Sequence, residues 1–244
     1  MKAMIFAAGL GTRLRPLTND RPKALVEVGG RPLLEWAIRL LKKHGFDDLI
    51  INVHHFSQQI VDFIDRKAAF GISIQISDES DLLLDTGGGL KKARSFFDEA
   101  PFLVYNADVL TNMDLTAFYQ QHLQSGALAT LAVRNRPSSR MLLFDEGNSL
   151  VGWKNNSTGE QVRCRDAEAT KEMAFSGIHA ISPLLLEHFP EEAVFSIIPL
   201  YLRLGAEFPI KAYAHDADSW VDVGKASGLE RAAELIVDLS GGHL

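Results

Sequence analysis

Glycines and cationic side chains crowd together at the start of the chain. Gly9 and Gly11 follow directly on the apolar run of residues 3–7. Glycines carry no side chain and adopt backbone conformations closed to other residues, so a phosphate chain can lie directly on the N–H groups of such a loop. The same stretch carries the cations Arg13, Arg15, Arg21 and Lys23. Because the whole chain has a net charge of −6, this local positive charge indicates a polyanionic ligand.

A carboxylate is predicted at the end of a second buried strand. Residues 102–105 form an apolar run, and Asn106, Ala107 and Asp108 follow it. The carboxyl ends of parallel strands form the ligand-binding edge of an open α/β sheet, which is where the glycine loop is also expected. There Asp108 either binds Mg²⁺ together with water and phosphate oxygens or caps the following turn.

The hydrophobic pattern predicts elements that bring these residues together. Short buried strands alternate with amphipathic helices in the first half of the chain, which is typical of a doubly wound α/β fold. The predicted strands cover residues 3–7, 49–53, 72–76, 102–105, 127–133 and 174–181, and the predicted helices cover 33–44, 115–124 and 225–239. We therefore expect a Rossmann-like, mostly parallel sheet in a single domain over residues 1–244, with a small β-hairpin insertion at 141–153.

Composition excludes several classes of protein. A net charge of −6 argues against nucleic acid as a partner. The single cysteine, Cys164, excludes an intramolecular disulfide. The N-terminal apolar run is too short for a signal peptide, and no stretch is long enough to span a bilayer. We expect a cytoplasmic protein without a membrane partner, as a monomer or a small homo-oligomer.

Residues 85–89, Asp-Thr-Gly-Gly-Gly, are predicted to form a flexible loop that leads into a helix near Leu90. Such glycines let a planar base or a ribose approach the backbone closely. A glycine run by itself is more often an ordinary loop than a binding site.

The opening motif resembles a known signature. Gly9-x-Gly11-Thr12-Arg13-Leu14-x-Pro16-Leu17-Thr18, followed by Pro22-Lys23, is similar to that of the sugar-1-phosphate nucleotidyltransferases, which join a nucleoside triphosphate (NTP) to a sugar 1-phosphate and release pyrophosphate. It is not a Rossmann fingerprint, because the third glycine of Gly-x-Gly-x-x-Gly is absent and Leu14 stands there. It is not a Walker phosphate loop either, because no Gly-Lys-Ser/Thr follows.

The resemblance implies roles for particular residues. It implies that Arg13, Lys23 and Asp108 act in catalysis and that Asp108 and Asp222, in a Trp-x-Asp-x-Gly segment, bind Mg²⁺. The implied nucleotide-binding residues are Ala8, Gly9, Gly11, Thr12, Arg13, Lys23, Gly87 and Gly88. The implied sugar-phosphate ligands are Asn106, Lys154, Ser176 and Gly177. Ala107 departs from the family, which commonly has glycine there, so the sugar pocket is expected to be narrower or displaced.

The resemblance also suggests substrates. The Asp-Thr-Gly-Gly-Gly and Phe-Ser-Gly-Ile segments are most similar to N-acetylmuramate-1-phosphate uridylyltransferases, which implies UTP, N-acetylmuramate 1-phosphate and a role in cell-wall nucleotide-sugar biosynthesis. A mannose- or heptose-1-phosphate guanylyltransferase is the alternative within the class. A non-catalytic subunit that binds sugar nucleotides is the alternative outside it. The hexapeptide-repeat domain of some relatives is not expected. A glycosyltransferase is disfavoured, because Asn106-Ala107-Asp108 is only half of an Asp-x-Asp motif.

Overall fold

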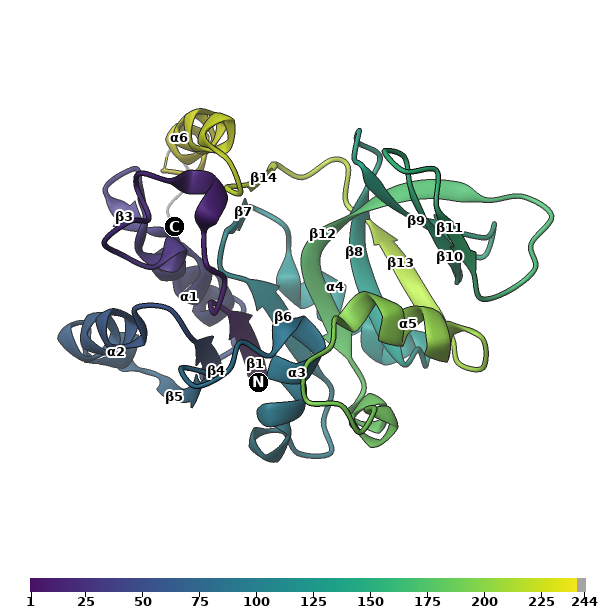
Figure 1. The fold of residues 1–244 in the computed structure, drawn as a ribbon, viewed down its shortest axis with the longest axis horizontal. Coiled ribbons are helices and arrows are strands. Elements are labelled where there is room, and N and C mark those ends of the chain that lie inside the picture. Colours follow the sequence, from purple (N-terminus) through teal and green to yellow (C-terminus); the bar gives the residue numbers. More distant parts are fainter. Residues whose placement is uncertain (241–244) are drawn as a thin grey trace.

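Four parallel strands, of which β5 (Ser73–Asp78) is a partly exposed edge strand, form one side of a ten-stranded sheet. A computed structural model of the chain describes residues 1–240, and Figure 1 shows this half at the centre and left of the molecule. The strands lie in the order β5 (Ser73–Asp78), β4 (Asp48–Val53), β1 (Lys2–Phe6) and β6 (Phe102–Asn106). The predicted strands at 49–53, 72–76 and 102–105 are therefore present, with ends that differ by one or two residues.

The other half of the sheet is largely antiparallel. Its long strand, β12 (Lys171–Ile181), runs antiparallel to β6 on one edge and to β8 on the other, and its first residues pair with β9. The remaining strands are β8 (Ala129–Arg134), β9 (Arg140–Phe144), β10 (Leu150–Asn155), β11 (Gln161–Arg163) and β13 (Ile210–Ala214). Strands β9 and β10 form the predicted hairpin.

Helices cover both faces of the sheet because side chains alternate along each buried strand. On β1, Ala3 and Ile5 pack in one apolar cluster and Met4 packs in the other. The first cluster includes side chains of α1 (Leu33–Lys43), α2 (Ser57–Arg66) and α4 (Leu115–Ser125). The second includes side chains of α3 (Asp85–Lys92) and α5 (Ile197–Gly205). The predicted doubly wound, Rossmann-like fold is confirmed.

A small third cluster joins the two ends of the described chain. It contains apolar side chains of α1, of the hairpin β2 (Glu27–Val28) with β3 (Arg31–Pro32), of the pair β7 (Val109–Thr111) with β14 (Trp220–Asp222), and of α6 (Ala226–Ser240). Figure 1 shows α6 beside the N-terminal segment, near β14. The short 3₁₀ helices are η1 (Thr12–Leu14), η2 (Lys23–Leu25), η3 (Ala68–Gly71), η4 (Arg94–Phe96) and η5 (Pro183–His188). Within residues 1–240, no helix combines the length and apolar composition needed to cross a membrane.

Three buried histidines predict how stability depends on pH. Burial lowers the pKa of His122 and of His215 to about 4 and that of His179 to about 3. Each pKa lies below the ordinary value of 6.5, so the unfolded chain binds more protons than the folded protein between the two values. Stability contributed by the neutral imidazoles is therefore complete above pH 6.5 and decreases as the pH falls toward 4.

We expect the urea midpoint to fall from pH 7.5 to pH 5, with a smaller fall in His122→Gln than in the wild type. His122 accepts or donates one hydrogen bond, to the Thr130 hydroxyl at 2.8 Å, which glutamine can replace without titrating. Each such histidine contributes at most about 1.4 kcal/mol per pH unit. A pH dependence identical in the two proteins would contradict this assignment of His122.

Candidate active site

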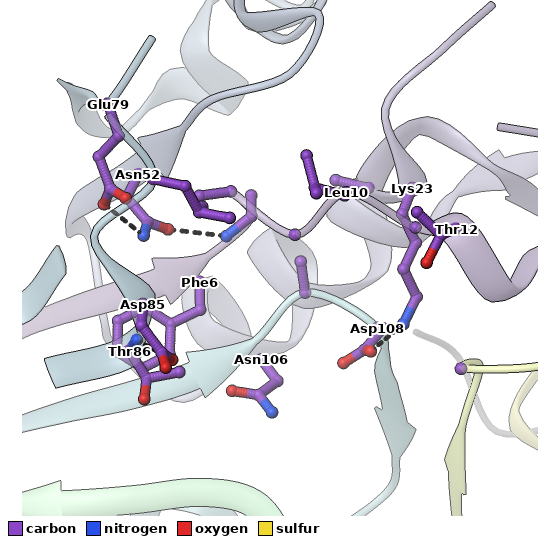
Figure 2. Close-up of a pocket in the computed structure, with 18 of the residues that line it drawn as sticks. Phe6, Leu10, Thr12, Lys23, Asn52, Glu79, Asp85, Thr86, Asn106 and Asp108 are labelled. Carbon is purple, nitrogen blue, oxygen red and sulfur yellow. Dashed lines mark hydrogen bonds and ion pairs between the residues drawn. The ribbon is translucent and has the colours of Figure 1, made fainter. Parts of the chain in front are cut away.

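A cavity of about 620 Å³ lies at the carboxyl ends of β1, β4 and β6. Its lining includes the glycine loop, the cations Arg13 and Lys23 that were predicted to act in catalysis, and Asp108. Figure 2 shows Lys23 beside Asp108. The predicted residues that line it are Ala8, Gly9, Gly11, Thr12, Arg13, Lys23, Asn106 and Asp108. The structure therefore brings these predicted residues together at one edge of the sheet, although some of them are separated by about a hundred positions in the chain.

The glycine loop closes tightly on itself at Gly11. This residue has φ +64°, and a Cβ there would lie 2.9 Å from Lys23 Cβ and 3.0 Å from Thr18 Cγ2. The Thr18 hydroxyl donates a 2.9 Å hydrogen bond to the Gly11 carbonyl oxygen. Only glycine satisfies both the left-handed backbone and the close approach. Gly11 thereby brings Lys23 against the loop and into the cavity.

A buried polar pair that the sequence analysis missed holds the start of this loop. Asn52 Oδ1 accepts a 2.8 Å hydrogen bond from the Ala7 amide, and Asn52 Nδ2 donates a 2.7 Å bond to Glu79 Oε1. Glu79 Oε2 also accepts from the Leu84 amide at 3.2 Å. Both side chains line the cavity and are almost completely buried (Figure 2). In the sequence, Asn52 and Glu79 are distinguished only as polar residues near the end of a predicted strand.

Lys23 and Asp108 form an ion pair inside the cavity (Figure 2). Lys23 begins η2 and Asp108 follows β6, so the pair joins the signature segment to the sheet edge. The side chains are 13% and 23% exposed, respectively, which leaves both within reach of a ligand. Lys23 can transfer its hydrogen bonds from the carboxylate to a phosphate oxygen when one is bound.

Asp222 is brought to Asp108 by backbone pairing. Strands β7 and β14 are antiparallel, with Asp222 opposite Val109, and the Val223 amide donates a 2.9 Å bond to the Asp108 carbonyl oxygen. Next to them, a Cβ on Gly224 would lie 2.8 Å from Asp222 Oδ1 and 3.2 Å from Arg13 Nη2. Asp222 does not line the cavity itself, but it lies at its border, where Gly224 does.

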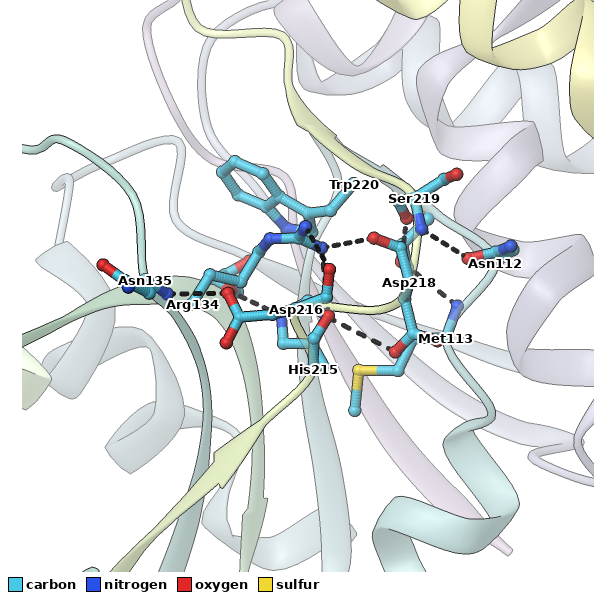
Figure 3. A network of polar contacts seen from close by, with 11 residues as sticks. Asn112, Met113, Arg134, Asn135, His215, Asp216, Asp218, Ser219 and Trp220 are labelled. Atoms are coloured by element: carbon cyan, nitrogen blue, oxygen red, sulfur yellow. Dashed lines mark hydrogen bonds and ion pairs between the residues drawn. The ribbon is translucent and has the colours of Figure 1, made fainter.

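Arg134 fixes the loop that leads into β14 (Figure 3). Its Nη1 donates to the carbonyl oxygens of His215, at 3.1 Å, and Asp218, at 2.5 Å, and its Nη2 donates to that of Asp216, at 3.1 Å. Across the loop, the Ser219 amide donates a 2.8 Å bond to Asn112 Oδ1. These bonds add hydrogen-bond donors to a run of backbone carbonyl groups in the loop. They fix the loop that enters β14 and therefore help to set the position of Asp222 at the end of that strand.

The electrostatics of the two carboxylates fit a divalent cation. Burial and then the charge of Asp108 raise the pKa of Asp222, while Lys23, Arg13 and Arg136 act in the opposite direction. Two carboxylates that repel each other beside the glycine loop are a suitable oxygen donor set for Mg²⁺, which keeps several water and phosphate ligands. Among the side chains that the structure describes, no group of three or more His, Cys, Asp or Glu residues is placed to hold a metal ion.

The prediction of a flexible loop at residues 85–89 is wrong, because the glycines lie inside α3. The amides of Gly87 and Gly88 donate to the Phe195 carbonyl oxygen at 2.9 and 3.1 Å. A Cβ on Gly87 would lie 2.3 Å from the Phe195 ring, and one on Gly88 would lie 2.1 Å from the Ala193 carbonyl oxygen. The glycines therefore seat the segment of residues 193–195, and neither lines the cavity. Their neighbours Asp85 and Thr86 do.

The residues predicted to bind the sugar phosphate are only partly brought together. Asn106 lines the cavity, and a Cβ on Gly177 would lie 2.7 Å from its Nδ2, so the two are adjacent. Ser176 is buried, and its hydroxyl makes a 2.8 Å hydrogen bond with His215 Nε2. Lys154 forms an ion pair with Glu172 on the hairpin side and does not line the cavity.

A glycine loop with cations and carboxylates at the carboxyl edge of an open α/β sheet is suited to phosphate ligands, as in nucleotide-using enzymes of the doubly wound class. A family model of the nucleotidyl transferases matches residues 2–141, more than half of the chain. The chain therefore belongs to the nucleotidyl transferase family. The enzyme class predicted from the opening motif is confirmed at this level.

The chain is also similar to individual proteins. It is 31% identical over 241 residues to N-acetylmuramate alpha-1-phosphate uridylyltransferase of Neisseria meningitidis, covering 96% of this chain and 98% of that one. It is 30% identical over 245 residues to UTP–glucose-1-phosphate uridylyltransferase of Synechocystis, of which it spans only 60%. The structure of UDP-glucose pyrophosphorylase from Acinetobacter baumanii superposes with a TM-score of 0.78 at 19% identity, covering 100% of this chain and 95% of the other, and shows the shared fold.

The contacts of α3 predict an unusual substitution effect. Replacing a helical glycine by alanine ordinarily stabilises a protein by about 1 kcal/mol. We expect Gly88→Ala to destabilise instead, by about 1–3 kcal/mol, because the new methyl overlaps the Ala193 carbonyl oxygen. We also expect a raised KM for the NTP, because Val194 of the same segment lines the cavity.

Urea unfolding and steady-state kinetics measure both effects. Gly147→Ala is the matched control, since its Cβ would meet only Asp145 Oδ1 at 3.4 Å, an ordinary contact. A Gly88→Ala protein at least as stable as the wild type would refute the seating role of this glycine.

Proposed function

We propose that the protein transfers a nucleotidyl group from an NTP to a sugar 1-phosphate in the presence of Mg²⁺, giving a nucleotide sugar and pyrophosphate. The favoured substrates are UTP and N-acetylmuramate 1-phosphate, which would make the product a cell-wall precursor. The observation that carries the proposal is the convergence of Arg13, Lys23, Asp108 and Asp222 at one end of the cavity. Similarity to the uridylyltransferase of Neisseria along nearly the whole chain supports the choice of sugar and base.

The reaction needs two anions brought together and aligned. A phosphate oxygen of the acceptor forms a bond to the α-phosphorus of the NTP, and the bond from that phosphorus to the bridging oxygen of the β-phosphate breaks. The electron pair leaves with pyrophosphate. A sugar phosphate is already largely dianionic at neutral pH, so no general base is required. Positioning and charge stabilisation supply the rate enhancement.

The side chains of the site have separate parts in this transfer. The loop amides around Gly9 and Gly11 bind the phosphate chain of the NTP, and Arg13 holds the departing pyrophosphate. Lys23 neutralises the α-phosphate and the incoming acceptor. Asp108 and Asp222 would hold Mg²⁺, which when bound screens the repulsion between the two phosphate groups.

The far end of the cavity accommodates the base. Figure 2 shows Asp85 and Thr86 at the end opposite Lys23 and Asp108. Leu83 and Val194 add apolar surface to the lining. Apolar faces and a few polar groups are the usual surroundings of a bound base.

Guanine is the second candidate base, and Asp85 is the observation that favours it. The Asp85 side chain is exposed, lines the cavity and accepts a hydrogen bond from the Thr86 amide with one oxygen. A carboxylate can accept from both N1–H and N2–H of guanine, whereas uracil offers a single N–H between two carbonyl groups. A GTP-dependent enzyme acting on mannose or heptose 1-phosphate is therefore the alternative activity.

Pyrophosphate release with Mg²⁺ tests the proposal across four NTPs and the 1-phosphates of N-acetylmuramate, N-acetylglucosamine, glucose, mannose and heptose. We expect release with UTP and N-acetylmuramate 1-phosphate. Release only with GTP would instead support the guanylyltransferase. Nucleotide binding in a thermal shift without release from any pair would support a non-catalytic binding subunit.

Asp108→Asn and Asp222→Asn should each reduce kcat by at least about a thousandfold while circular dichroism stays native, because each removes one carboxylate of the proposed Mg²⁺ site. Asp145→Asn, at an exposed turn on the hairpin, provides the control for loss of one carboxylate. A rate near that of the wild type in either variant would remove that residue from the metal site.

A further inference from the structure

Arg136 is a partly buried cation without a counter-charge in contact with it. It follows β8, and its guanidinium carbon lies 4.6 Å from the centre of the Trp220 ring. Nη2 donates to the Phe175 carbonyl oxygen at 3.1 Å and Nη1 approaches the Pro137 carbonyl oxygen at 3.4 Å. Among the side chains that the structure describes, none forms an ion pair with it, and its buried Nε has no hydrogen-bond partner.

The surroundings of Arg136 are positive except for Asp222. Burial lowers the pKa of Arg136; Asp222 opposes this shift, and Arg134 and Arg231 add to it. An arginine that is partly removed from water and surrounded by like charges is stabilised when an anion binds beside it.

The position of Arg136 points to one substrate. Strand β12 has an irregularity between Phe175 and His179, within which Gly177 packs on Asn106 of the cavity. Arg136 contacts the start of the same irregular segment and, through Trp220, the strand that carries Asp222. Arg13 and Lys23 approach the carboxylates from the glycine loop, whereas Arg136 approaches from β8. The glycine loop, on one side of the two carboxylates, is proposed to bind the NTP. The other side, which Arg136 approaches from β8, is therefore the place for the acceptor.

We infer that Arg136 binds an oxyanion of the sugar 1-phosphate acceptor. This inference rests on the proposed function and adds a specificity-determining residue to it. The oxyanion is either the 1-phosphate itself or a carboxylate carried by the sugar, as the lactyl group of N-acetylmuramate provides. A carboxylate and a terminal phosphate group each present two oxygens that a guanidinium can bind with two N–H groups.

Arg136→Gln tests the inference through Michaelis constants. At saturating NTP, we expect the acceptor KM to rise about tenfold or more, as for loss of a hydrogen bond to a charged group. The KM for the NTP should change less than twofold, and Arg136→Lys should recover part of the acceptor affinity. Arg140→Gln removes the same charge from an exposed position and should leave both constants unchanged.

Two acceptors separate the sources of the oxyanion. If Arg136 binds the 1-phosphate, Arg136→Gln raises the KM for N-acetylglucosamine 1-phosphate and N-acetylmuramate 1-phosphate alike. If it binds the lactyl carboxylate, only the KM for N-acetylmuramate 1-phosphate rises. An acceptor KM within twofold of the wild type for both substrates, or an equal rise in Arg140→Gln, overturns the inference.

Equilibrium binding keeps this test separate from that of the proposed function. A wild-type protein that turns over no pair refutes the proposed activity. Calorimetric titration with N-acetylmuramate 1-phosphate alone then decides the inference, with weaker binding to Arg136→Gln than to Arg140→Gln expected. Equal binding to the two variants, or no binding to the wild type, overturns it. Where Arg136→Gln fails to fold, Arg136→Lys replaces it, with an expected acceptor KM above that of the wild type.

Discussion

The structure holds two aspartates together against their mutual repulsion. Backbone pairing between β7 and β14 sets the position of Asp222 beside Asp108, so the backbones of the two residues cannot move apart without breaking strand hydrogen bonds. Burial and, after it, the charge of Asp108 raise the pKa of Asp222. Three cations oppose this shift, namely Lys23 on η2, Arg13 on η1 and Arg136 after β8. Segments from the beginning, the middle and the end of the described chain must therefore meet for the site to form.

The rest of the cavity depends on similar long-range contacts. Asn52 and Glu79 connect β4 and the end of β5 to the amide of Ala7, which fixes the start of the glycine loop. Residues 193–195 cross over α3 because Gly87 and Gly88 leave room for them. A glycine run that reads as a ligand-binding loop serves here to pack one segment of the chain against another. Its influence on the nucleotide passes through the neighbouring residues Asp85, Thr86 and Val194, which line the cavity.

Local sequence information was sufficient for much of this arrangement. The parallel strands β1, β4 and β6 were predictable because both of their faces are buried, which produces continuous apolar runs. The edge strand β5 was predictable from its alternating polar positions, and the glycine loop because its motif is long. Strand β13 (Ile210–Ala214) was missed, since its pairing with β8 is decided by packing and its sequence alternates only weakly. Arg136 and Glu79 were also missed, because the role of an isolated charged residue depends on the residues that surround it in space. The family resemblance implied Lys154 as a ligand of the sugar phosphate, but the structure pairs it with Glu172.

The central claim is that the acceptor phosphate attacks the α-phosphorus of the NTP within this cavity. It is tested most directly by incubating UTP, Mg²⁺ and N-acetylmuramate 1-phosphate labelled with ¹⁸O at the non-bridging phosphate oxygens, and locating the label by ³¹P NMR. The account predicts a nucleotide sugar with one ¹⁸O in the bridge between its two phosphorus atoms, together with unlabelled pyrophosphate. Label in the pyrophosphate, or UTP hydrolysis without a nucleotide sugar, would contradict it.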